Sequence, residues 1–290
     1  MRLLTLLLAA TTAFAEPTWH PFGPGGGGWI EDVVAHPTNA KEVWAMTDLS
    51  GLFRSQDAGV TWRKMSADVE RGVMARKQIV SHNRQFAIDP KDSKHLYWGV
   101  CGMIWASHDG GVTWQAVFGT APKVGDDKTP QLGHAMACAA DGSVYALDHE
   151  STLRVSRDHG ATWTELTKPP VAKNSPDTPA FPFLLADGTL CVACRPSPGL
   201  AISKDGGKTW ENVLRPENAN GTRDVEYAFD KPGIVFATSQ GAGGGFGGGA
   251  PGAAPAGPNG TALFKSTDEG KTWKKIDSLP PYTGRISVAV

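Results

Sequence analysis

The octet at residues 55–62, SQDAGVTW, decides the fold because the chain contains it five times. Every copy keeps Ser-x-Asp-x-Gly-x-Thr-Trp, and the first serines stand at positions 55, 107, 156, 203 and 266. The other four copies read SHDGGVTW, SRDHGATW, SKDGGKTW and STDEGKTW. A sequence period of about fifty residues is typical of propellers and other repeat architectures.

Each octet ends a longer unit whose parts keep a fixed order. An alternating apolar run and a polar turn come first, as in QFAIDPKDSK, and a second apolar run follows, as in HLYWGVCG. A third run, as in MIWAS, leads into the octet, and its closing Thr-Trp begins a short fourth strand. Four strands per unit are one blade of a β-propeller. The sequence therefore predicts an all-β propeller of four-stranded blades, with five blades visible.

The propeller is expected to cover residues 16–290. Residues 240–260, QGAGGGFGGGAPGAAPAGPNG, lengthen the last unit, and their composition is typical of a flexible loop. The chain ends on residues 285–290, RISVAV, which resemble the first strand of a sixth unit. We therefore expect an incomplete propeller that is truncated from a larger one.

Composition limits the classes of partner. The 28 basic and 29 acidic residues leave no charge excess for nucleic acid or an anionic membrane. Residues 1–15, MRLLTLLLAATTAFA, have the pattern of a secretory signal peptide, with a positive start, an apolar core and a small-x-small cleavage site. We expect a secreted protein, extracellular or periplasmic, whose mature chain is monomeric and does not insert into a membrane.

Four cysteines are present, at positions 101, 138, 191 and 194. Cys191 and Cys194 lie in the strand-like run TLCVAC, where residues three apart face opposite sides of a sheet. A disulfide between them would need distortion, and a zinc site would need a second pair of ligands at suitable spacing. The sequence favours buried free thiols, and it predicts neither a metal nor another cofactor.

The octets match the Asp-box, or BNR repeat, of sialidases, sortilin-like receptors and several glycoside hydrolases. In those families the box is a turn between the third and fourth strands of a blade, on the face opposite the usual ligand site. An Asp at the third position can accept backbone N–H bonds within its own turn, and Gly at the fifth allows a positive φ. The resemblance thus assigns a structural role to the third-position aspartates, Asp57, Asp109, Asp158, Asp205 and Asp268.

A second resemblance is more specific and covers about residues 19–60. The glycine run 25–28, the HPT turn at 36–38 and the segment Thr47-Asp48-Leu49-Ser50-Gly51 look like the opening of family 74 glycoside hydrolases. Those enzymes are xyloglucan-active and are built from two seven-bladed propellers. Two positions depart from the family pattern: Ser50 replaces a usual Gly, and Met46 stands where an Arg usually precedes Thr-Asp.

The resemblance implies that Asp48 is the general base of an inverting hydrolysis of a β-glucan- or xyloglucan-type polysaccharide. An inverting hydrolase needs a second carboxyl group, which in that family comes from the second propeller and would lie beyond residue 290. Other loops expected on the same face would contact the polysaccharide or oligosaccharide. The candidate binding residues are Trp29, Asp148, His149, Glu150 and Arg195, and Arg223 with Asp224 is a further loop pair.

Two other functions remain open. A non-catalytic binding or assembly-factor propeller of the sortilin type shares the same repeats. A sialidase would need an Arg-Ile-Pro segment before the first box, and none precedes Ser55. The hydrolase is the favoured hypothesis, with the binding propeller as its alternative and the sialidase last.

Overall fold

The fold is built from five antiparallel sheets of four strands each, together with one helix in the part of the chain that the structure describes. The structure is a computed structural model. It describes residues 30–47, 51–74, 85–100, 102–119, 135–147, 152–170, 181–185, 187–193, 199–217, 219–227, 231, 233–241 and 261–278.

The first two blades contain the helix between them. Blade 1 comprises β1 (Ile30–Ala35), β2 (Val43–Thr47), β3 (Gly51–Ser55) and β4 (Arg63–Lys64). Helix α1 (Ala67–Met74) follows it. Blade 2 comprises β5 (Gln85–Ile88), β6 (Leu96–Val100), β7 (Met103–Ser107) and β8 (Gln115–Gly119).

The other three blades repeat the same order. Blade 3 comprises β9 (Ala135–Cys138), β10 (Val144–Leu147), β11 (Leu153–Ser156) and β12 (Thr164–Glu165). Blade 4 comprises β13 (Phe181–Leu184), β14 (Leu190–Ala193), β15 (Leu200–Ser203) and β16 (Glu211–Leu214). Blade 5 comprises β17 (Ala219–Tyr227), β18 (Val235–Gly241), β19 (Ala262–Ser266) and β20 (Lys274–Lys275).

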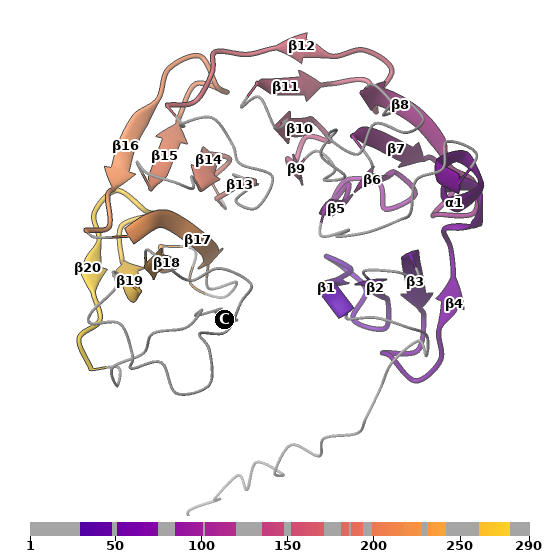
Figure 1. Cartoon of the computed structure of the whole chain (residues 1–290), viewed down its shortest axis with the longest axis horizontal. Coiled ribbons are helices and arrows are strands. Elements are labelled where there is room, and N and C mark those ends of the chain that lie inside the picture. Colours follow the sequence, from indigo (N-terminus) through magenta and orange to yellow (C-terminus); the bar gives the residue numbers. More distant parts are fainter. Residues whose placement is uncertain are drawn as a thin grey trace, which may run out of the picture.

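The strands of each blade pair in chain order, from the centre of the molecule to its rim. Figure 1 shows the first strand of each sheet nearest the common centre and the fourth strand outermost. The all-β propeller with Asp-box turns that the sequence predicts is confirmed for five blades. The expected first strand of a sixth unit, residues 285–290, lies outside the described residues.

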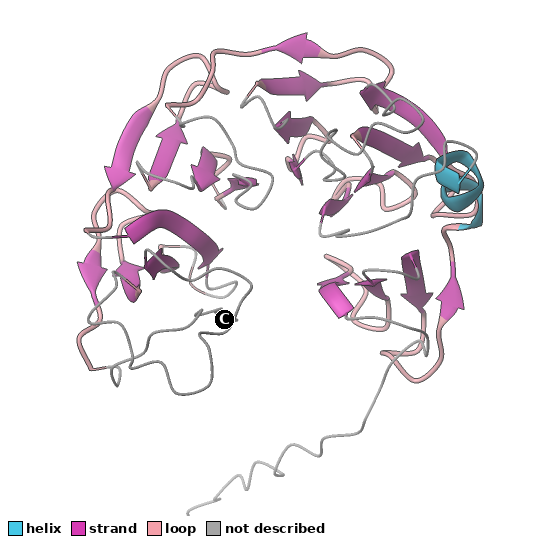
Figure 2. Cartoon of the chain, in the orientation of Figure 1, coloured by secondary structure: helices cyan, strands magenta, loops and turns pink. Residues whose placement is uncertain are grey.

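Helix α1 follows blade 1 and is an element that the sequence did not predict (Figure 2). Its first turn carries Asp68 and Glu70, and acidic side chains stabilise the N-terminal end of a helix. Val69 is fully buried in the core shared by blades 1 and 2. Val69 therefore covers the junction of blades 1 and 2.

The core lies between neighbouring blades. Four apolar clusters fill the junctions, and each Asp-box tryptophan from blade 2 onward joins the cluster of the preceding blade. Trp114 also donates its indole N–H to the Met65 carbonyl at 2.9 Å, and Trp210 donates to the Thr167 carbonyl at 3.1 Å. Through this packing and these hydrogen bonds, the tryptophans connect one blade to the blade before it.

The cysteine and loop predictions have mixed outcomes. Cys191 is a buried free thiol in β14, whereas Cys138 is a free thiol that is only partly buried. Cys101 and Cys194 lie outside the described residues. The placement of Arg223 and Asp224 in a loop is wrong, because β17 continues through both positions with irregular register.

Candidate functional site

Strand direction divides the turns between two faces. In each blade the chain turns from the first strand to the second, and from the third to the fourth, at one end of the sheet. The second-to-third loops lie at the other end, because neighbouring strands are antiparallel. The Asp-box turns and the strand ends Thr47 and Gly51, which flank Asp48 in the chain, therefore lie on opposite faces.

The ends of the Asp48 loop are fixed by strands β2 and β3 of blade 1. Thr47 and Gly51 are paired residues of this hairpin, and the Thr47 hydroxyl donates to the Gly51 carbonyl at 3.2 Å. Gly51 has φ of 86°, a value that favours glycine. Asp48 itself lies outside the described residues, as do Leu49 and Ser50. The described geometry fixes where this loop leaves and re-enters the sheet.

A polar group packs directly behind the re-entry point. The Ser66 hydroxyl accepts the Leu52 N–H at 3.2 Å and donates to Glu70 Oε1 at 2.6 Å. Lys64 pairs with Glu70 Oε2 at 2.8 Å. A Cβ on Gly51 would lie 2.3 Å from Ser66 Oγ and 2.4 Å from Glu70 Oε1, so only glycine fits there.

Sequence reasoning missed this carboxylate beside the base of the Asp48 loop. The signal was present in the run Ser66-Ala67-Asp68-Val69-Glu70, because a serine before acidic residues is typical of a helix start. A helix at that point returns Glu70 toward the strand end. Glu70 is therefore a further polar residue on the face of the loop candidates.

The other loop candidates belong to segments that the structure does not describe. Trp29, Asp148, His149, Glu150 and Arg195 all lie outside the described residues. Their neighbours locate them along the chain: Leu147 ends β10 before residues 148–150, and Ala193 ends β14 before Arg195. Their grouping around Asp48 stays a prediction.

The five Asp-box turns share one hydrogen-bond pattern. In each, the first-position serine donates to Asp Oδ1 and accepts the N–H of the fifth-position glycine, at 2.7–2.8 Å. The seventh-position threonine donates its N–H to Oδ1 and its hydroxyl to Oδ2, at 2.5–2.9 Å. Both carboxylate oxygens are thus engaged within their own turn.

This hydrogen bonding changes the acidity of the aspartates. The Thr61 hydroxyl and N–H, followed by the Ser55 hydroxyl, lower the pKa of Asp57 to about 2. The corresponding Thr162 and Thr272 donors lower the pKa of Asp158 and Asp268 to about 2. Because general acids and bases work best with a pKa near the operating pH, this arrangement suits a turn stabiliser.

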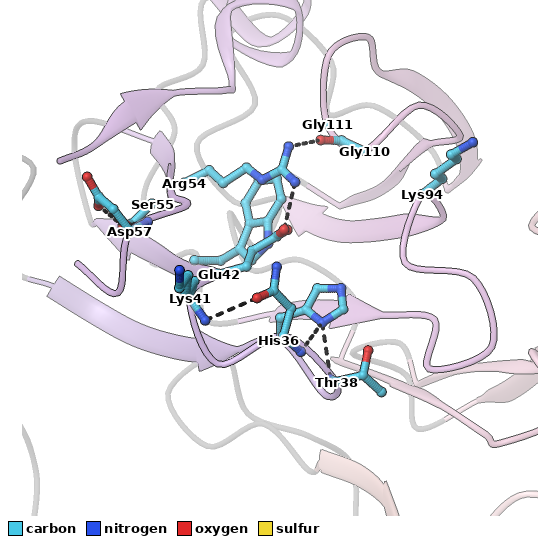
Figure 3. A network of polar contacts seen from close by, with 12 residues as sticks. His36, Thr38, Lys41, Glu42, Arg54, Ser55, Asp57, Lys94, Gly110 and Gly111 are labelled. Carbon is cyan, nitrogen blue, oxygen red and sulfur yellow. Dashed lines mark hydrogen bonds and ion pairs between the residues drawn. The ribbon is translucent and has the colours of Figure 1, made fainter. Parts of the chain in front are cut away.

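A buried ionic network joins the Asp-box turn of blade 2 to blade 1 (Figure 3). The Arg54 guanidinium lies between Glu42 and the Gly110 carbonyl, with Nη2 2.7 Å from Glu42 Oε2 and Nη1 3.2 Å from the carbonyl oxygen. Glu42 also accepts the Trp44 indole N–H at 3.0 Å, and Arg54 lies 5.2 Å from the centroid of the Trp44 ring. Trp44 is fully buried, so it belongs to the core.

Within the described ranges, no three His, Cys, Asp or Glu side chains form a group that could hold a metal ion. Among the same residues, no helix has the length and apolar character needed to cross a membrane.

Comparisons with known proteins agree with the repeat and the fold. The family description "BNR/Asp-box repeat" matches residues 201–212, which include the fourth octet. A xyloglucanase of Acetivibrio thermocellus, Xgh74A, is 24% identical over 301 residues, which cover 89% of this chain and 33% of that protein. The chain spans about a third of the length of this curated relative.

Solved structures show the same architecture at low sequence identity. The crystal structure of an ancestral GH74 enzyme has a TM-score of 0.60 and 16% identity, and the match covers 93% of this chain and 34% of that chain. YCF48 from Cyanidioschyzon merolae has a TM-score of 0.51 and 13% identity, with 86% and 85% covered. The chain is therefore an Asp-box β-propeller that is glycoside hydrolase-like and similar to GH74 propellers.

Proposed function

We propose that the face opposite the Asp-box turns binds a β-glucan- or xyloglucan-type polysaccharide, and that the protein hydrolyses this polysaccharide with inversion. Asp48 is the general base that activates water in this proposal. The observation that supports it is that the strand ends Thr47 and Gly51, which flank Asp48 in the chain, lie on that face in a chain similar to a xyloglucanase. An inverting hydrolase also needs a general acid about 6.5–9.5 Å from the base.

The polar group behind the loop supports this assignment. A general base must be held in position, since small displacements of a catalytic group cost much of the rate. Glu70 bonds Ser66, and Ser66 bonds the Leu52 N–H at the point where the loop re-enters the sheet. These contacts fix one end of the Asp48 loop. Sugar contacts would come from Trp29, Asp148, His149, Glu150 and Arg195.

The proposed setting is outside the cytoplasm. Residues 1–15 would be removed as a signal peptide, and residues 16–290 would form the propeller domain with the 240–260 segment as a loop. The mature protein would act as a soluble monomer. Secretion of the expressed protein, with Glu16 as its first residue, is the measurement that tests this.

The catalytic test compares reducing-sugar release from xyloglucan and mixed-linkage β-glucan by the full-length protein, with the second propeller expected to carry the general acid, and by its Asp48→Asn variant. Loss of a general base lowers the rate by about 10²–10⁴-fold. Asp57→Asn is the matched control, since it removes an equivalent carboxylate on the opposite face. Equal activity of the protein and Asp48→Asn would exclude the assigned base.

Binding is tested separately by affinity electrophoresis in xyloglucan gels. Trp29→Ala should lose retardation, whereas Trp62→Ala, on the Asp-box face, should keep it. If both variants bind as the parent does, the binding face is assigned wrongly.

The second candidate is a binding propeller without catalysis. The observation that favours it is the Asp-box propeller fold itself, which a non-catalytic binding propeller of the sortilin type shares. Polysaccharide binding without reducing-sugar release would favour this candidate over the hydrolase.

A further inference from the structure

Three histidines from three separate turns meet at the junction of blades 2 and 3, on the Asp-box face. His95 immediately precedes β6, His108 occupies the second position of the blade 2 octet, and His159 occupies the fourth position of the blade 3 octet. No part of the proposed polysaccharide site uses them, because that site lies on the opposite face.

The ring of His95 contacts each of the other two rings. His95 Nδ1 and His108 Nδ1 are 2.8 Å apart. The rings of His95 and His159 are stacked, with centroids 3.8 Å apart and planes inclined by 10°. His159 is on blade 3 and the other two are on blade 2, so this stack is a contact between blades.

A buried carboxylate faces the cluster. Asp89 is fully buried, and its Oδ1 accepts the Lys91 N–H at 2.8 Å. Its Oδ2 lies 3.6 Å from His159 Nδ1, and both atoms are buried without a hydrogen-bond partner in the structure. A small movement of either side chain would bring this pair within hydrogen-bonding distance, because its separation exceeds a normal bond by only a few tenths of an ångström.

Other titratable groups also lie near the three rings. Asp92 lies on the same turn as His95, with its Oδ2 3.8 Å from His95 Nε2. Tyr97 and Cys138 are the neighbours of Asp89 from β6 and β9, and burial raises the pKa of both groups. They stay neutral at physiological pH, and Asp92 and Asp89 are the carboxylates whose charge acts on His95.

The contacts limit how many protons the cluster can hold. The bond between His95 and His108 requires one Nδ1 to donate and the other to accept, so both rings cannot be charged while it persists. Protons on both His95 and His159 would place two cations in a stack whose ring centroids are 3.8 Å apart, where they repel strongly.

Burial, followed by repulsion from His159 and His108, lowers the pKa of His95 from its usual 6.5. Asp92 and Asp89 oppose this shift. The unfolded chain binds this proton more readily than the folded chain. The contribution of His95 to the free energy of unfolding is therefore largest above pH 6.5. It falls as the pH drops from 6.5 toward the folded pKa.

We propose that His95, His108, His159 and Asp89 form a proton-sensitive contact between blades 2 and 3. The contact is closed while the cluster holds no more than one proton, and it loosens when a second proton binds. Acidification would thus act on the Asp-box face of one blade junction and leave the other junctions unchanged.

The test uses the whole chain, with a chelator present, and follows the histidine ring signals and the amide exchange by NMR from about pH 8 to about pH 5, the range over which histidine titrates. His95 should titrate below pH 6.5. Protection of the Gly110 amide, which bonds the Lys94 carbonyl at 3.0 Å, should fall by about tenfold or more on acidification. The Glu269 amide makes the equivalent bond to Gly233 in blade 5 and should keep its protection.

Two variants separate the cluster from general charge effects. His95→Gln removes the central ring, so the acid-induced loss of protection at Gly110 should disappear. Lys94→Gln changes the charge of the same turn without touching a ring, so the loss should persist. A His95 titration at or above pH 6.5, or equal losses at Gly110 and Glu269, would overturn the proposal even if His95→Gln does not fold.

Discussion

At the scale of single residues, the repeated octet is explained by bonds that its own side chains make. The aspartate engages both oxygens with the serine and threonine of the same turn, and all five copies do so. Such a carboxylate stabilises the turn only while it is ionised, because a protonated oxygen accepts these hydrogen bonds poorly. The octet thus links turn stability to pH.

Asp57 provides a test of that link. Its pKa is lowered from 3.8 to about 2, so its contribution to stability is present above pH 3.8 and is lost as the pH falls toward 2. We expect the melting temperature of Asp57→Asn to depend less steeply on pH across that interval than the parent's. Asp277→Asn, at an exposed aspartate, is the control and should follow the parent. Parallel curves for all three proteins would contradict the assigned role.

The fourth position of the octet holds a conformational detail that the sequence did not predict. Ala58, His159 and Glu269 have φ of 59°, 56° and 59°, although none is glycine. A left-handed conformation costs such residues roughly 1–2 kcal/mol, and glycine adopts it without that cost. The turn bonds therefore impose this strain in three of the five blades.

A matched pair of substitutions measures the strain. Ala58→Gly should raise the free energy of unfolding by about 0.5–1 kcal/mol, after the added flexibility of the unfolded chain is taken into account. Gly206→Ala should lower the free energy of unfolding by a similar amount, because it introduces the same left-handed strain. No steric clash adds to this cost, since the new Cβ would meet nothing closer than Tyr145 at 3.9 Å. Urea denaturation provides both values. A loss of stability in Ala58→Gly would contradict the strain argument.

At the scale of elements, alternation and turn residues were sufficient to predict four strands per blade. Runs such as HLYWGV and MIWAS became β6 and β7 because their apolar residues fill the blade junctions. Helix α1 has a helix-start signal at Ser66, but the packing of Val69 in the core and the contacts of Ser66 and Glu70 at the start of β3 are tertiary. Such tertiary contacts are not visible in a local pattern.

The candidate sites illustrate the same limit. The face that carries Asp48 follows from strand alternation alone, so it could be predicted. The roles of Glu70 and the histidine cluster could not, because they depend on contacts between separate turns: Glu70 lies beside Gly51 of the preceding hairpin, His108 is 13 positions from His95, and His159 comes from another blade. His95 and His159, for example, meet only because the blade 2 and blade 3 turns adjoin.

The ionic network of blade 1 provides an element-scale prediction. Glu42 is nearly buried, and it joins Arg54 and Trp44. Removal of its charge leaves a partly buried guanidinium without its anion, so Glu42→Gln should cost about 3 kcal/mol of unfolding free energy. Glu165→Gln breaks a more exposed pair with Arg154 and should cost less than about 1 kcal/mol. Equal costs in urea denaturation would show that burial does not set the difference.

At the scale of the whole molecule, the blades form a series in which each packs on its neighbours. Trp114 packs on the core of blade 1, and Trp273 packs on the core of blade 4. In such an architecture the stability is close to a sum of blade terms and junction terms. Substitutions at one junction should therefore influence each other, while substitutions at distant junctions should not.

Double-mutant cycles test this independence. Trp114→Phe removes the indole bond to the Met65 carbonyl, and Glu42→Gln disturbs Arg54, which bonds the Gly110 carbonyl of the same octet. Their costs should differ from additivity by about 0.5–3 kcal/mol, as for groups that share a contact region. Trp114→Phe with Trp273→Phe, three blades apart, should be additive within about 0.5 kcal/mol. Strong coupling in the distant pair would mean that the five blades respond as one unit, and that protons bound between blades 2 and 3 would be felt throughout the propeller.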